Sequence, residues 1–133
     1  MHNNHTLTET DLQRFTGDLE RFRHPFVRSV IYTPGVKCVA ERGGAYWLID
    51  ELAFAIAGGE ITKAGKRDPR VLEMHFWTLT VNDQVGELTA RADSDVEPFF
   101  VKGIDYTDFP LDKIDIWAAF DGEHWTLYLP SEH

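Results

Sequence analysis

Apolar and polar positions follow a helical period at the start of the chain and an alternating period towards its end. Near the N-terminus, four apolar side chains recur every three or four residues: Leu12, Phe15, Leu19 and Phe22. Thr8 precedes this stripe and can cap a helix, and the early acidic residues suit the helix dipole. Gly17 predicts a break between two short helical pieces, and Pro25 ends the pattern because a proline disfavours helical geometry in the residue before it. Residues 1–7 are expected to be flexible.

The next segment predicts a hairpin followed by a helix. Residues 27–33 are β-branched and apolar, Pro34 and Gly35 suit a turn, and residues 36–41 resume a strand-like composition. Residues 45–57 carry apolar side chains at helical spacing and on nearly every side. This pattern predicts a helix that is buried on more than one side.

From residue 71 onward the apolar positions alternate, as is typical of strands. The charged and Gly-containing residues 60–70 predict a loop before this region. Asp121 and Gly122 separate two aromatic-rich runs, which is a strong hairpin signal. The expected strands lie at residues 71–81, 85–92, 99–102, 114–120 and 124–129.

These elements predict a single α+β domain over residues 1–133. We expect a mainly antiparallel sheet of about five to six strands, packed against one buried helix at residues 45–57 and joined to a short N-terminal helical segment. A chain of 133 residues with a hydrophobic fraction of 43% can form such a core without a metal or a disulfide. The one cysteine, Cys38, cannot form an internal disulfide.

The negative charge is concentrated in the last third of the chain. The net charge is −9, and residues 93–133 hold ten acidic and two basic side chains, a net of −8. Such a surface repels nucleic acid and attracts a basic protein partner, although solvated acidic strands without a partner give the same pattern. The candidate binding residues are the carboxylates Asp105, Asp108, Asp112, Asp115, Asp121 and Glu123.

A second set of residues predicts an alternative site, a pocket formed by Arg23, His24 and Asp50. The cations at residues 21–24 can hold an anion, or they can instead offset the dipole at a helix C-terminus. A carboxylate such as Asp50 on a largely buried helix is costly unless it is bonded, so it is either a satisfied core acid or a catalytic group. Cys38 is interpreted as an inert buried thiol rather than a nucleophile.

The sequence contains none of the short motifs that hold metals, nucleotides or a catalytic serine. His75 and His124 lack a third ligand of known position, so no metal ion and no cofactor is predicted. No apolar run approaches the ~18 residues of a membrane span. The N-terminus lacks the pattern of a signal peptide, and a cytoplasmic location is therefore expected.

Several blocks between residues 15 and 53 resemble those of a known family. They are Phe-Thr-Gly at 15–17, Arg-His-Pro at 23–25, Tyr-Thr-Pro-Gly-Val at 32–36 and Gly-Ala-Tyr-Trp-Leu-Ile-Asp at 44–50. The stretch resembles small bacterial proteins of unknown function that occur in bacterial genomes and on mobile elements such as plasmids and phages. The resemblance implies a compact bacterial or mobile-element protein, and it carries over no catalytic residue.

The preferred hypothesis is a non-enzymatic protein-binding module that uses an acidic C-terminal face. One version is an inhibitor, encoded by a mobile element, that mimics the charge of DNA. Binding of this kind weakens as salt is added. The alternative is a small enzyme or ligand-binding domain with its pocket near His24 and Asp50. A homodimer, formed through apolar residues of the helix or of an edge strand, is compatible with either hypothesis.

Overall fold

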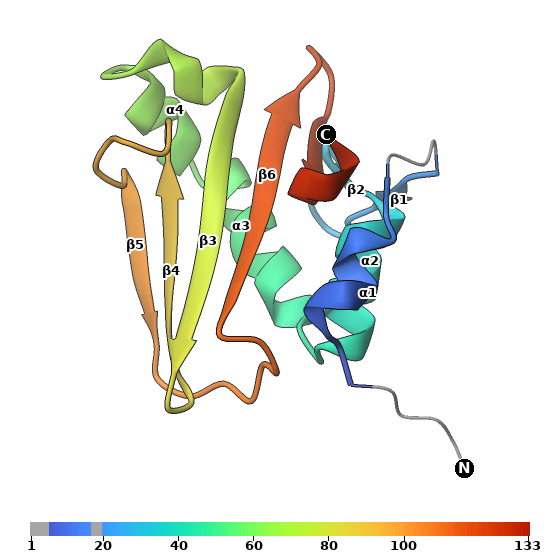
Figure 1. Ribbon diagram of the computed structural model, residues 1–133. Helices are drawn as coiled ribbons and strands as arrows, with labels where there is room; N and C mark the ends of the chain where they lie inside the picture. Colours follow the sequence, from blue (N-terminus) through green and yellow to red (C-terminus); the bar gives the residue numbers. More distant parts are fainter. Residues whose placement is uncertain (1–5, 17–19) are drawn as a thin grey trace.

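One mixed sheet organises the part of the chain that the computed structural model describes, residues 6–16 and 20–133 (Figure 1). Within these residues the sheet has seven strands, in the order β1-β2-β7-β6-β3-β4-β5. β2 and β7 run parallel, and the other neighbouring strands pair antiparallel. The strands are β1 (Phe22–Arg23), β2 (Val30–Tyr32), β3 (Met74–Asn82), β4 (Val85–Arg91), β5 (Phe100–Ile104), β6 (Lys113–Phe120) and β7 (Trp125–Tyr128).

The α+β class is confirmed, whereas the expected count of five to six strands is too low for the described residues. The sequence predicts β3 to β7, with bounds that differ by a few residues. It misses β1. It places a strand over β2, but it pairs that strand wrongly, in a hairpin with residues 36–41. These two strands have two and three residues, which is too short for an alternating pattern. The parallel pairing of β2 with β7 joins distant parts of the chain, so no local signal predicts it.

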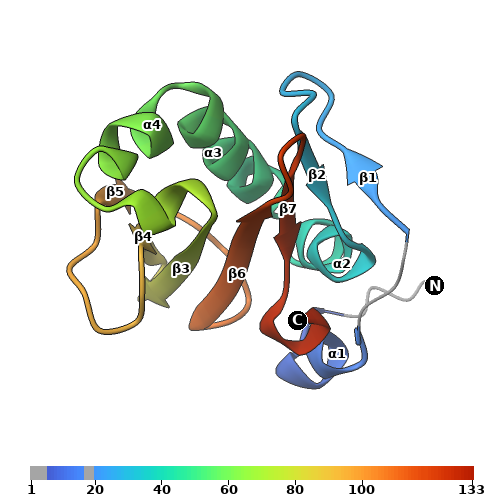
Figure 2. The same cartoon turned by 90° about the horizontal axis from the view of Figure 1, so that it is seen from above.

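Two of the helices, α3 (Tyr46–Ala57) and α4 (Glu60–Gly65), cover one face of this sheet (Figure 2). In Figure 2, α3 and α4 lie on one side of β3, β4 and β6, and α1 lies on the other side together with the C-terminus. α2 contacts α1, α3 and β7. The α-helices of the described residues are α1 (Glu9–Gln13), α2 (Pro34–Arg42), α3 (Tyr46–Ala57) and α4 (Glu60–Gly65), and 3₁₀ helices occur at Pro69–Leu72 and Pro130–Glu132.

The predicted hairpin at residues 27–41 is wrong, because α2 replaces its turn and its second strand. Pro34 occupies the first turn of the helix, where its missing N–H costs nothing. Thr33 caps the helix by accepting a hydrogen bond from the Val36 N–H at 3.3 Å. Val36, Val39 and Ala40 are buried at helical spacing. Their burial against the core outweighs the strand preference of the β-branched residues.

Two further expectations need correction. Residues 60–70 are not simply a loop, because α4 and the first two residues of a 3₁₀ helix lie there. Phe22 lies in β1 rather than on a helix. The proposed break at Gly17 falls outside the described residues, as do residues 1–5 of the expected flexible start. Leu7, however, is buried in the core.

The N-terminal helix and the long central helix agree with the sequence pattern. Thr8 and Asp11 form a reciprocal capping box at the start of α1. α3 packs its buried side chains against the sheet, but Tyr46 and Phe54 are exposed. The helix is therefore less enclosed than its composition suggests. Between β3 and β4, Asp83 and Gln84 adopt positive φ angles of 55° and 65°, a geometry that suits a tight hairpin turn.

Candidate functional site

The six candidate carboxylates do not gather on one face. Asp112 precedes β6 and Asp121 follows it, so the strand separates them by about 30 Å at ~3.3 Å per residue. Figure 1 shows the β5–β6 loop and the β6–β7 turn at opposite ends of the sheet. Asp105 and Asp108 lie with Asp112 in the β5–β6 loop, and Glu123 lies with Asp121.

The larger group, which we call the acidic end, consists of Asp83, Asp105, Asp108 and Asp112. The first of these lies in the β3–β4 turn and the others lie in the β5–β6 loop. Backbone hydrogen bonds join the two segments. The Thr107 N–H donates to the Gln84 carbonyl at 2.9 Å, and the Val81 N–H donates to the Asp112 carbonyl at 2.8 Å. These contacts hold four carboxylates from separate parts of the chain close to one end of the sheet.

The acidic end is exposed and has an apolar component. All four of its aspartates are exposed, and within residues 6–16 and 20–133 none of them forms an ion pair. Tyr106, with 66% of its surface exposed, lies in the same loop, and the exposed Val85 follows the adjoining turn. Tyrosine is enriched in protein interfaces, so this end combines charge with a suitable contact residue.

The remaining candidate carboxylates have separate local roles. Asp115 lies on the sheet face away from α3, where it accepts a hydrogen bond from the Thr78 hydroxyl at 2.8 Å. Asp121 accepts hydrogen bonds from the backbone N–H groups of His124 at 2.7 Å and Glu123 at 2.8 Å, which stabilise the β6–β7 turn. These bonds to the charged form lower the pKa of the Asp121 carboxyl. Glu123 projects into solvent beside the same turn.

The structure brings together two residues of the alternative site, His24 and Asp50. His24 Nε2 lies 2.7 Å from Asp50 Oδ1. The ring is 1% exposed, whereas half of the Asp50 side-chain surface is exposed. Nδ1 of His24 accepts hydrogen bonds from the backbone N–H groups of Val27 at 2.9 Å and Phe26 at 3.1 Å. This geometry assigns the ring proton to Nε2, which donates it to Asp50.

The His24–Asp50 pair therefore acts as a clamp between the β1–β2 turn and α3. Both ring nitrogens are engaged, so neither is available to accept a proton from a substrate in this geometry. Phe54 packs its ring edge-on against His24, with centroids 5.5 Å apart. Arg23 is exposed on β1, and no described ion pair joins it to Asp50. A carboxylate bonded to a core group, one of the two interpretations of Asp50, accounts for this arrangement.

Two buried polar groups are not explained by the sequence pattern. His75 is completely buried, and its Nδ1 lies 3.2 Å from the Val71 carbonyl oxygen. Its Nε2 and the indole nitrogen of Trp77 lack a hydrogen-bond partner among the described residues. Burial lowers the pKa of His75 from 6.5 to about 4, against the opposing effect of the Val71 hydrogen bond. The two rings fill an aromatic part of the core, where the neutral form of His75 is favoured.

Cys38 lies on α2 rather than mid-strand, and it is half-buried. Burial raises the pKa of its thiol, whereas Arg42 lowers it only in part. A raised pKa reduces the thiolate fraction near neutrality, which agrees with an inert thiol. In the described ranges, no three His, Cys, Asp or Glu side chains are placed to hold a metal ion. None of the helices described there has the length and apolar character needed to cross a membrane.

Sequence reasoning missed a groove of about 670 Å³ on the sheet face away from α3. Phe76, Arg91 and Trp117 contribute to it from three adjacent strands. Its rim includes Asp93 and Ser94 of the β4–β5 loop. The sequence signal for this groove is the alternating pattern of residues 71–81, because it assigns Phe76 to the opposite face of β3 from Trp77.

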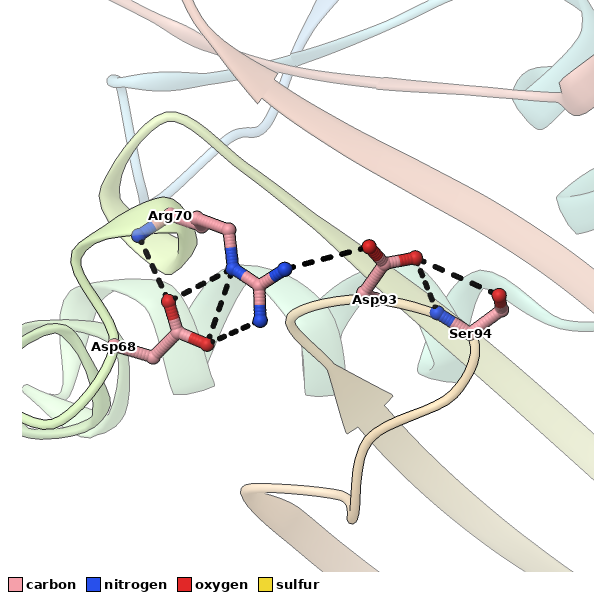
Figure 3. A network of polar contacts seen from close by, with 4 residues as sticks. All are labelled: Asp68, Arg70, Asp93 and Ser94. Carbon is pink, nitrogen blue, oxygen red and sulfur yellow. Dashed lines mark hydrogen bonds and ion pairs between the residues drawn. The ribbon is translucent and has the colours of Figure 1, made fainter.

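Figure 3 shows the polar network that holds this rim. Arg70 binds Asp68 at 2.7 Å and reaches Asp93 at 3.4 Å. The Ser94 N–H donates to the carboxylate of Asp93 at 2.7 Å. These bonds connect the 3₁₀ helix after α4 to the β4–β5 loop, so one edge of the groove is fixed by charge and backbone contacts together.

The fold and the charged loops define a small α+β protein whose mixed sheet is covered on one face and carries an acidic end. The chain belongs to a family of unknown function, DUF6876, whose sequence model matches residues 6–133. This finding confirms membership of an uncharacterised family. A protein of unknown function from Enterococcus faecalis is similar at 19% identity and a TM-score of 0.47, over 87% of this chain and 93% of that chain. No curated protein matches the chain.

Proposed function

We propose that this chain is a non-enzymatic protein-binding module that engages a basic partner through its acidic end. The supporting observation is the group of four exposed aspartates, Asp83, Asp105, Asp108 and Asp112, without ion pairs in the described ranges. A partner with lysine or arginine at matching positions would gain favourable electrostatic interactions at low salt. Tyr106 would supply apolar contact at the centre of such an interface.

The proposed function also includes the cellular compartment and the kind of partner. A cytoplasmic bacterial protein of this kind could bind the nucleic-acid-binding surface of another protein, since that surface is basic. An inhibitor encoded by a mobile element is one form of the proposal, and direct binding of nucleic acid is not part of it. The clamp geometry gives less support to an enzyme, because both nitrogens of His24 are bonded. Self-association through the exposed Tyr46 and Phe54 of α3 would be compatible, and light scattering measures it.

The decisive experiment compares two variants with the same change of charge. The first removes three of the four charges of the acidic end by Asp105→Asn, Asp108→Asn and Asp112→Asn. The matched control neutralises three exposed carboxylates at the opposite end of the sheet. Its substitutions are Asp95→Asn, Glu97→Gln and Glu123→Gln. Each protein is immobilised and exposed to a bacterial lysate at about 0.05 M and about 0.5 M salt, a range over which screening increases strongly.

We expect the wild type and the control variant to retain the same basic protein at low salt. The acidic-end variant should not retain that protein, and high salt should release it from the wild type and from the control variant. Equal loss from both variants would show that net charge alone is responsible. Capture that survives high salt, or the absence of any basic partner, would contradict the proposal.

A further inference from the structure

The groove on the open face of the sheet has the size of a small-molecule site. Its volume of about 670 Å³ lies within the range of about 300–1,000 Å³ that is usual for ligand pockets. It is separate from both the acidic end and the His24–Asp50 clamp. The residues that line it are Phe76, Thr78, Thr80, Arg91, Asp93, Ser94, Lys113, Asp115 and Trp117.

Strand register aligns an arginine with aromatic rings across this face. Arg91 of β4 is paired with Phe76 of β3, which is paired in turn with Trp117 of β6. The rings of Phe76 and Trp117 meet edge to face with centroids 5.3 Å apart. Trp117 also contacts Tyr128 of β7, its partner in register. The row therefore presents a guanidinium at one end and an aromatic surface beside it.

The guanidinium of Arg91 lacks a carboxylate partner in the part of the chain that the structure describes. Its Nε donates to the Val96 carbonyl at 3.2 Å, and one terminal nitrogen donates to the Thr89 hydroxyl at 3.3 Å. Both acceptors are neutral, so they orient the side chain without cancelling its charge. An arginine has five N–H donors, and the remaining ones are available to a ligand.

The two carboxylates that line the groove are already engaged. Asp93 binds the Ser94 N–H and Arg70, as Figure 3 shows. Asp115 accepts from Thr78 and lies 3.9 Å from the ammonium of Lys113. Two acidic and two basic side chains line the groove, and among these four Arg91 is the one without an ion pair in the described ranges. Charge complementarity favours an anionic group at Arg91.

We propose that this groove binds a small carboxylate that has an aromatic body. The carboxylate accepts charge-assisted hydrogen bonds from Arg91, and the ring of the ligand packs against Phe76 and Trp117. This geometry uses the planar donor fork of arginine, which matches a carboxylate better than a lysine would. Aromatic contact then selects an organic acid over an inorganic anion.

The test uses 3-phenylpropionate as the probe and its neutral amide, 3-phenylpropionamide, as the matched control. Both are titrated into the ¹⁵N-labelled wild-type chain, and the NMR signals of the Arg91 and Phe76 amides and of the Trp117 indole are followed. We expect saturable shifts with the acid in about the millimolar range that suits a compound of this size. The amide should bind at least about tenfold more weakly, since it lacks the charge-assisted bonds.

Arg91→Gln should weaken binding of 3-phenylpropionate by about tenfold and leave the weak affinity for 3-phenylpropionamide unchanged. Arg28→Gln, which removes an exposed arginine on the β1–β2 turn, should change neither affinity. Equal binding of acid and amide by the wild type would overturn the proposal, as would shifts confined to other surfaces or no saturable shift up to about 10 mM. The comparison of acid with amide remains decisive even if Arg91→Gln does not fold, because it uses the wild-type chain.

Discussion

Acidification should destabilise this fold through the buried side chain of His75. The ring is completely buried, and the ring centroids of Trp125, Trp77 and Phe99 lie 4.8, 5.7 and 5.7 Å away. Its Nδ1–H donates to the Val71 carbonyl, whereas Nε2 lacks a partner among the described residues. A proton added to Nε2 would place a charge in an apolar aromatic environment, so the folded state resists protonation.

The pKa of His75 gives the size of this effect. Burial lowers the pKa from 6.5 to about 4 in the folded protein, and the Val71 hydrogen bond opposes that change. Between these two values the unfolded chain binds a proton that the folded chain does not. Stability is therefore complete above pH 6.5 and falls as the pH decreases towards about 4. At ~1.36 kcal/mol per pH unit the full loss is about 3 kcal/mol, of which about 2 kcal/mol has occurred by about pH 5.

The assay is urea-induced unfolding of the wild type and of His75→Phe at about pH 7 and about pH 5. Phenylalanine retains the ring packing and removes the titrating group. Most carboxylates remain ionised at about pH 5, so they contribute little to the change. The wild type should lose about 2 kcal/mol more stability than the variant between the two conditions. An equal loss in the two proteins would refute the assignment of this pH dependence to His75.

Three further predictions concern the clamp, a close backbone contact and the thiol. His24→Ala should destabilise the fold by about 2–4 kcal/mol in thermal and urea unfolding, because it removes the three hydrogen bonds of a buried ring. Asp50→Asn retains an acceptor oxygen and should cost under ~1 kcal/mol; similar costs for the two variants would contradict the clamp. A Cβ at Gly35 would lie 2.6 Å from a carboxylate oxygen of Glu132, so Gly35→Ala should lower the free energy of unfolding by about 1–3 kcal/mol. The control is Gly103→Ala, whose added Cβ meets no atom within 4 Å and should change stability little in the same assay. Cys38 should react with an aromatic disulfide reagent more slowly than a free thiol in a peptide near neutral pH, since its pKa is raised; equal rates would contradict an inert thiol.

The elements that could be predicted from sequence are those whose signal is local and long. β3 and α3 have nine and twelve residues, enough for an alternating or a helical period to emerge. α2 was misread because Pro34-Gly35 suits a turn, although Pro also suits the first turn of a helix. β1 and β2 are defined by pairing, and the pairing of β2 with β7 joins residues almost a hundred positions apart.

The candidate site residues show the same difference between local sequence signals and long-range contacts. Asp112 and Asp121 flank one predicted strand, so the sequence already contained the signal that they lie at opposite ends. The contact of His24 with Asp50 spans 26 residues and depends on how the β1–β2 turn meets α3. The Arg91–Phe76–Trp117 row depends on the register of three strands, one of which is far away in sequence. Register follows from tertiary packing, so local patterns do not determine it.

The acidic end is the centre of this account, and an NMR titration with a short lysine-rich peptide tests it most directly. At low salt, the amides of Asp83, Asp105, Asp108 and Asp112 should shift first and should saturate together. Signals from Asp121 and Glu123 should respond only at higher peptide concentration, because Asp121 is already bonded to two backbone N–H groups and Glu123 lies beside His124. Shifts of equal size and midpoint at both ends, or a response that persists at high salt, would contradict the claim.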